Sequence, residues 1–374
     1  MIEDRIKFYA ELEKLRNRPL IVYVTSARSG MGGLMGADAI PEFLDQLELL
    51  PSDAKAVDLL VVSNGGDPIV AWRVITLLRE RVEQVFVLVP QAAYSAATLL
   101  AMGADEIVMH PNGNLGPVDP QILVKRAGEA EPHRFGFEEM TSFLQFAKDK
   151  VGITDQRYLH AIFDLLSKEV GPVHVGVGAR ASLLSVSLGE KLLRLHMKGE
   201  GDVQRVHNLA EALNTAFYHH GYTLGRKEAI QIGMKIAPPN QEVERLMWSI
   251  WLDLEMELQV RKPFAPLFVL MKSSSAKTKL IEKVQQAKYP PGGPPLQAIS
   301  QLGMNKLFDD DKGVESVGFE AIHAVMESTR TASRFITKGS VIGARTPDLV
   351  IRVNIVPESS QWEKKEIHKT SARE

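Results

Sequence analysis

The sequence predicts an α/β fold, and three observations support that class. Short apolar runs rich in β-branched residues alternate with helix-length segments through the first hundred residues. Glycine-rich turns follow two of these runs, as at the carboxyl ends of parallel strands that bind ligands. With 374 residues, of which 45% are apolar and 24% charged, the chain has the composition of one large folded domain with an extension.

Four strands and four helices are expected before residue 110, because apolar periodicity switches repeatedly between the two patterns. The strands are expected at residues 19–25, 57–63, 85–89 and 106–109, and the helices at 2–15, 38–50, 69–81 and 95–103. Between the first strand and the second helix, the glycine-rich segment Ser29–Gly36 lacks the Lys-Ser/Thr ending of a phosphate-binding loop. We expect it to be a mobile loop over a substrate groove.

Long helical segments replace this alternation after residue 120. They are expected at 137–150, 155–168, 182–197, 201–219 and 242–259, with a glycine- and valine-rich connector at 171–180. A Pro/Gly-rich loop at 289–295 and a β-hairpin at about 330–356 follow. We divide the chain into an N-terminal helix (1–18), a main domain (19–236) and a C-terminal extension (237–374).

Composition excludes several classes of function. The chain has no cysteine, so a covalent nucleophile must be Ser, Thr, Lys or a carboxylate. Its 44 basic residues nearly cancel 46 acidic ones, which argues against a nucleic-acid partner. No ligand spacing typical of a metal site is found. The N-terminus lacks the apolar core of a signal peptide, and no apolar run is long enough for an integral membrane segment, so we expect a cytoplasmic protein.

Two short motifs place chemistry at the ends of predicted strands. Gly65-Gly66 directly follows a buried strand, so its backbone N–H groups are free to face a ligand, although such a turn also simply ends a strand. Ser95 begins a helix of small residues, where it is either an N-cap or a nucleophile beside the helix dipole.

These motifs closely resemble the serine dehydrogenase proteinase family of the signal-peptide-peptidase-A and ClpP-like clan. The segments that carry the resemblance are 64–67, 93–109, 115–121 and 220–233. The resemblance runs from about Pro19 to Ile236. It implies a ClpP/crotonase-like spiral of repeated β-β-α units, a helical arm through which protomers of a homo-oligomer pack, and a C-terminal α+β extension.

The resemblance also implies a catalytic site. Ser95 would be the nucleophile, and the N–H groups of Gly66 and Ala96 would form the oxyanion hole, with Gly65 beside them. Relatives of the signal-peptide-peptidase-A type use a lysine as general base, and a lysine can act so only when burial removes its proton. Lys191 is the first candidate for the base. Lys148 is the second, although it lies in what reads as the solvated end of a helix.

Asp119 either fixes the turn beside the site or only caps it, and the proline that follows favours the structural role. The function expected is a serine peptidase that cleaves a peptide or protein substrate without a cofactor, ATP-independent by itself, with an adaptor or ATPase as a candidate partner. One alternative is an inactive, oligomeric peptide-binding scaffold. A second is a crotonase-type enzyme that handles acyl-CoA.

Overall fold

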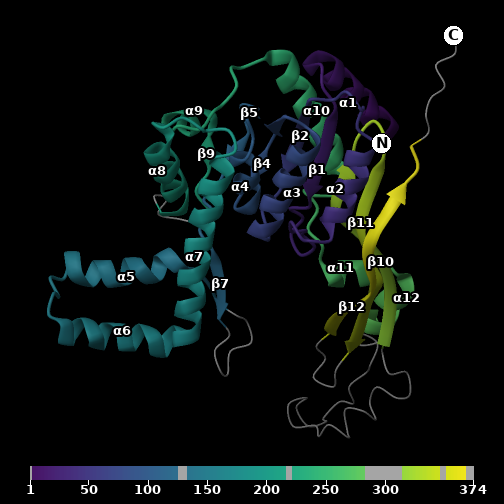
Figure 1. The fold of residues 1–374 in the computed structure, drawn as a ribbon. Coiled ribbons are helices and arrows are strands. Elements are labelled where there is room, and N and C mark those ends of the chain that lie inside the picture. The colour runs from purple at the N-terminus through teal and green to yellow at the C-terminus, as the bar shows by residue number, and fades with distance from the viewer. Residues whose placement is uncertain (1, 125–132, 216–220, 283–313, 346–350, 368–374) are drawn as a thin grey trace, which may run out of the picture.

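The central feature of the fold is a seven-stranded mixed sheet with the strand order β12-β11-β10-β1-β2-β3-β5 (Figure 1). The computed structural model describes residues 2–124, 133–215, 221–282, 314–345 and 351–367. The parallel strands are β1 (Leu20–Thr25), β2 (Ala56–Val62), β3 (Gln84–Val89) and β5 (Glu106–Met109). Each matches a run expected from the sequence, so the α/β class is confirmed.

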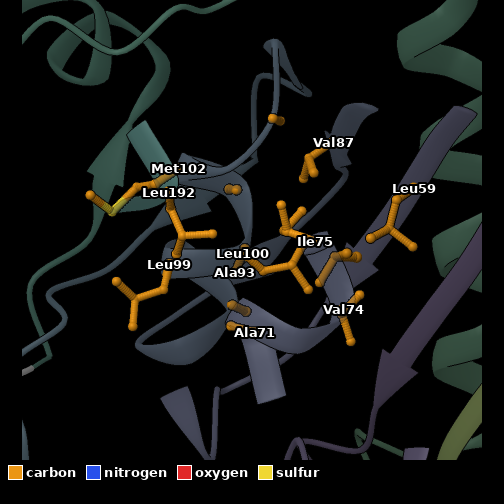
Figure 2. Close-up of a cluster of buried hydrophobic side chains, with 14 of the residues drawn as sticks. Leu59, Ala71, Val74, Ile75, Val87, Ala93, Leu99, Leu100, Met102 and Leu192 are labelled. Atoms are coloured by element: carbon orange, nitrogen blue, oxygen red, sulfur yellow. The ribbon is translucent and has the colours of Figure 1, made fainter. Parts of the chain in front are cut away.

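Helices cover both faces of the parallel strands because alternate strand residues point to opposite sides. Ile21 and Tyr23 of β1 belong to the core on one face, and Val22 and Val24 to the core on the other. The helices of the first face are α2 (Ala39–Glu48), α3 (Pro68–Arg81) and α4 (Ala96–Met102), and those of the second are α1 (Ile2–Arg16) and α10 (Gln241–Glu257). Figure 2 shows part of the first core, with side chains of α3 and α4 packed beside the sheet.

A second, small sheet lies beyond the carboxyl ends of the parallel strands, next to the end of β2, where Ser63 forms a bridge with Ala93. Its strands are β4 (Ala92–Ala93), β6 (Asn114–Leu115) and β9 (Leu224–Gly225), and the helix α9 (Arg226–Gln231) follows it. Because β3, β4 and α4 follow one another directly, this part of the chain forms a β-β-α unit of the expected kind. The arrangement places the start of α4 at the junction of the two sheets.

A helical arm projects from the body of the protein (Figure 1). It consists of α5 (Phe137–Asp149), α6 (Gln156–Val170) and α7 (Pro172–Leu193). Along the chain, the arm follows the hairpin formed by β7 (Gln121–Val124) and β8 (His133–Gly136), and it precedes the helix α8 (Asp202–Thr215). The connector predicted at 171–180 is wrong, since only Gly171 lies outside a helix there. Gly178 lies inside α7 in close contact with its neighbours, since a Cβ there would force the side chains of Ile122, Phe137 and Met140 to shift.

The C-terminal extension continues the central sheet. The expected hairpin is part of a three-stranded antiparallel unit, β10 (Val314–Glu327), β11 (Ala332–Arg345) and β12 (Ile351–Lys365). Its first strand, which the sequence did not predict, pairs antiparallel with β1 over Val22–Thr25. The short helices α11 (Pro266–Met271), α12 (Ser274–Lys277) and η1 (Thr278–Glu282) precede it. The loop predicted at 289–295 lies outside the described residues.

The N-terminal helix is joined to this extension by a buried ion network. Arg5 and Tyr9, both fully buried, bind the carboxylate of Glu327 at the end of β10, and Arg334 of β11 binds the same carboxylate. Hydrogen bonds and charges from these partners, outweighing the effect of burial, lower the pKa of Glu327. The first and last segments of the chain are therefore parts of one packed unit. Within the described part of the chain, no helix has the length and apolar character needed to span a bilayer.

Candidate active site

Ser95 has a strained backbone at the junction of the two sheets. Its φ of 52° and ψ of −119° lie outside the regions that a non-glycine residue ordinarily adopts. Such a conformation costs about 1–3 kcal/mol and persists only where the surroundings impose it. The surroundings here include hydrogen bonds from Ser63 N to Ala92 O (2.8 Å) and from Tyr94 N to Ser63 O (2.9 Å).

The hydroxyl of Ser95 is not used to cap the helix. Ser95 occupies the N-cap position of α4, but its side chain makes no capping hydrogen bond. An N-cap serine ordinarily accepts a hydrogen bond from one of the first backbone N–H groups of its helix. The structure thus gives no support to the purely structural interpretation of this serine, and leaves its half-buried hydroxyl available.

The Gly65-Gly66 turn lies directly against Ser95. A Cβ at Gly65 would lie 2.7 Å from the Ser95 Cβ, 2.7 Å from Tyr94 O and 3.0 Å from Ala96 N. Both glycines have positive φ, 95° and 149°, so side chains are excluded by conformation as well as by space. Only glycine at position 65 allows the turn and the start of α4 to approach this closely.

Two backbone N–H groups flank the serine. Gly66 forms a parallel bridge with Met35, in which Met35 N donates to Gly65 O (2.7 Å) and Asp67 N donates to Met35 O (2.9 Å). In such a bridge the middle residue directs its own N–H to the opposite side. Ala96 is the first residue of α4, where backbone N–H groups have no partner within the helix. The two donors and the helix dipole suit an anionic oxygen.

Two hydroxyl residues that we did not single out in the sequence hold the surroundings of Ser95, one at the glycine turn and one within α4. The Ser63 hydroxyl, which is buried, accepts hydrogen bonds from Gly65 N (3.1 Å) and from the Thr25 hydroxyl (2.7 Å). On the other side, the Thr98 hydroxyl binds Ala93 O (2.7 Å) and accepts from Gly116 N (3.1 Å). In the sequence, Ser63 is a single hydroxyl residue at the end of an apolar strand, and Thr98 is a single hydroxyl residue within an apolar helix. This pattern was the one signal that could have identified them.

The structure does not pair Ser95 with Lys191. Lys191 is exposed near the end of α7, with its Nζ 6.0 Å from the centre of the Trp72 ring. Its neighbour Leu192 packs beside Met102 and Gly103, at the opposite end of α4 from Ser95 (Figure 2). The eight residue steps from the N-cap Ser95 to the C-cap Gly103 span about 12 Å along the helix axis. The prediction of Lys191 as the base is corrected accordingly.

Lys148 is also remote within the chain. It is exposed in the last turn of α5, on the projecting arm (Figure 1). The amphipathic pattern of this helix explains its exposure, since Lys148 lies on the solvated face. Within one chain, Lys148 is therefore not the base of Ser95.

Asp119 is buried on the segment that leads from the small sheet to β7. Its carboxylate accepts a hydrogen bond from Gln121 Nε2 (2.8 Å). Burial, and then the charge of Asp119, raise the pKa of Glu138 at the start of α5. The hydrogen bond between Asp119 and Gln121 is thus local to the start of β7, and the role of Asp119 beside the site stays a prediction.

Comparison with known proteins agrees with the resemblance found in the sequence. Residues 34–130 match the family model of the ClpP-like SDH-type serine proteinases. The range contains Gly65, Gly66, Ser95 and Ala96, so the predicted resemblance is confirmed over the segment that builds the candidate site.

Two curated relatives are uncharacterized proteins of Methanocaldococcus jannaschii. MJ0137 is 33% identical over 124 residues, which is 32% of this chain and 43% of the relative. MJ1495 is 37% identical over 81 residues, 22% of this chain and 27% of the relative. The matches thus span less than half the length of either relative.

Among solved structures, two variants of the 1510-N membrane-bound stomatin-specific protease are similar, the second in complex with a substrate peptide. They share 14% and 15% identity with this chain, with TM-scores of 0.35 and 0.34. The alignments cover 61% and 60% of this chain, and 84% and 78% of the protease chains.

Proposed function

We propose that this protein is a serine peptidase in which Ser95 is the nucleophile and the N–H groups of Gly66 and Ala96 form the oxyanion hole. The observation that carries the proposal is the strained, uncapped Ser95 held between the Gly65-Gly66 turn and the start of α4. Strain of this kind is concentrated at functional sites, where it pre-orients a reacting group. The family match over the same residues supports this choice.

In the proposed reaction, the Ser95 oxygen attacks the carbonyl carbon of a peptide bond. Negative charge develops on the carbonyl oxygen, and the two N–H groups stabilise it. The serine proton passes to a general base and then to the leaving amine as the C–N bond breaks. Water next attacks the ester formed on Ser95, which releases the acid product and restores the hydroxyl.

The general base must lie within hydrogen-bond reach of Ser95. We propose that a lysine of a second copy of the chain provides it, and Lys148 is the candidate because it is exposed on a projecting arm. This arm also exposes large apolar side chains, which a second copy would cover. They include Phe143, Phe146, Tyr158, Phe163 and Leu165, with exposed fractions of 45–64%, and also Val173 and Leu183. The active form proposed is therefore a homo-oligomer.

Hydrolysis of a peptide library tests the proposal. Cleavage by the wild-type protein should disappear in Ser95→Ala and persist in Ser52→Ala, where an exposed serine far from the turn is changed. Cleavage that survives in Ser95→Ala would refute the role given to this serine. We propose a cytoplasmic location, and an adaptor or ATPase as the partner that delivers substrate.

One observation favours a second function, an oligomeric scaffold that binds peptides without cleaving them. Both predicted lysines lie away from Ser95 within the chain, so a single chain lacks the predicted dyad. The same library distinguishes the two functions. Peptides that are bound by the wild type and recovered intact would favour the scaffold.

A further inference from the structure

The C-terminal extension reaches the candidate site through the glycine-rich loop, here defined as residues 26–36. The sequence predicted a mobile loop, but two segments of the extension hold it in place. At one end, Phe264 N donates to Ser29 O (2.8 Å) and Arg28 Nε donates to Lys262 O (2.8 Å). A Cβ at Gly30 would collide with the Phe264 carbonyl, so the loop backbone lies directly on this segment.

His323 of β10 holds the middle of the loop. Its carbonyl accepts a hydrogen bond from Ser26 N (2.7 Å), and its ring Nδ1 lies 2.9 Å from Gly32 O. Because a carbonyl oxygen only accepts, the ring must donate through Nδ1. A Cβ at Gly33 would collide with the His323 carbonyl, which shows how closely the two backbones approach.

A β-bulge explains why this histidine faces the loop. The pairing of β10 with β11 shifts register between Ile322 and Ala324, which leaves His323 without a direct partner on β11. A bulge bends its strand and redirects the extra residue. Ala324 is the first residue of β10 that pairs with β1, and it lies opposite Thr25, the last residue of β1. The bulge therefore occurs where β1 ends and the glycine-rich loop begins.

The other end of the loop is in direct contact with the turn beside Ser95. Met35 donates its N–H to Gly65 O and accepts from Asp67 N, so it fixes the turn on both sides of Gly66. A Cβ at Gly66 would collide with the Met35 backbone. The position of Met35 thus sets the direction of the Gly66 N–H. Only two residues separate Met35 from Gly32, whose carbonyl His323 binds.

We propose that His323 is a positioning residue for the oxyanion hole. By holding the glycine-rich loop, it keeps Met35 against Gly66 and so keeps the Gly66 N–H directed at the oxygen that develops charge. The inference rests on the proposed function, because it assigns that N–H a catalytic task. It makes the extension, which lies outside the family match at residues 34–130, a working part of the active site.

The test uses the full-length protein with His323→Ala, His323→Asn and, as a matched control, His160→Ala on the exposed face of α6. The amide nitrogen of asparagine reaches about where Nδ1 lies and donates similarly. A fluorophosphonate probe gives the maximal labelling rate of Ser95 and the concentration for half that rate. Hydrogen exchange of peptides containing Met35 and Asp67 reports the turn, and peptides of β2 and β3 report the core.

We expect His323→Ala to lower the maximal labelling rate by about two- to tenfold, the range for one ordinary hydrogen bond. The half-saturating concentration should not change, exchange at Met35 and Asp67 should be faster, and the core should be unaffected. His323→Asn should return both readouts to within about twofold of wild type, a recovery that lost packing alone would not give. An unchanged labelling rate, or unchanged exchange at Met35 and Asp67, would overturn the proposal.

Failure of the proposed function would be distinguishable. If the wild type is never labelled, Ser95 is not a nucleophile, and hydrogen exchange alone then decides whether His323 positions the turn. Faster exchange in His323→Ala with recovery in His323→Asn would keep that structural coupling. Equal exchange in all four proteins would remove it.

Discussion

Substitution of Gly65 by alanine should destroy the candidate site while leaving most of the fold intact. The new Cβ would lie 2.7 Å from both the Ser95 Cβ and Tyr94 O, so the turn and the start of α4 must separate. The positive φ of 95° adds backbone strain of about 1–3 kcal/mol, and the steric clash adds about 1–3 kcal/mol more. The free energy of unfolding should therefore fall by about 2–6 kcal/mol.

Gly152→Ala is the matched control for this substitution. Gly152 also has a positive φ, 78°, but a Cβ there meets no atom within 4 Å. Its cost is the backbone strain alone, so the difference in unfolding free energy between the two variants isolates the clash at Ser95. Denaturant titration measures that difference.

The same two variants separate stability from activity. Gly65→Ala should slow fluorophosphonate labelling by at least about a hundredfold, because loss of one oxyanion donor alone costs that much. Gly152→Ala, on the loop between α5 and α6, should be labelled at the wild-type rate. Wild-type labelling of a folded Gly65→Ala protein would refute the account of the turn.

Three further predictions concern the arm and its partners. Co-expressed Ser95→Ala and Lys148→Ala chains, each inactive alone, should regain part of the peptidase activity in mixed oligomers, and no recovery would exclude a lysine from a second copy. Phe146→Glu should lower the oligomer mass measured by light scattering while the circular-dichroism spectrum stays that of a folded chain, whereas an unchanged mass would place the subunit interface elsewhere. The hydrogen bond to Glu190 raises the pKa of His207, so the stabilisation by this pair is complete below the ordinary histidine pKa and is lost as pH rises through the raised value. His207→Ala should flatten that decline in melting temperature, and an equal slope in both proteins would contradict it.

Local sequence signals were sufficient for the first 110 residues. Each strand there is a compact apolar run, and three of the four are followed by serine or proline, namely Ser26, Ser63 and Pro90. The helices show apolar residues at helical spacing. The Gly65-Gly66 turn could be identified because it follows such a strand, whereas Ser95, at the start of a helix of small residues, was assigned as nucleophile through the resemblance to a known family. Their closeness in space follows from the parallel sheet, in which neighbouring strands end at the same edge.

Strand pairing between distant parts of the chain could not be predicted from such local signals. β10 contains a bulge and Gly318, which interrupt simple alternation, and its partner β1 lies 300 residues earlier in the sequence. The segment 171–180 was predicted as a connector because Gly176 and Gly178 are typical of loops, whereas both lie inside α7, the second packed closely against Ile122. Lys191 was a candidate only because it is a lysine. The direction of its side chain depends on how α7 packs on α4, which the sequence does not indicate.

The central claim is that the uncapped hydroxyl of Ser95 is the nucleophile. Tandem mass spectrometry of the fluorophosphonate-treated protein tests it most directly, because the modified residue is identified. We predict one adduct per chain, on Ser95, that is absent from Ser95→Ala and depends on the intact Gly65-Gly66 turn. An adduct on a different residue, or no adduct on a folded oligomer, would contradict the claim.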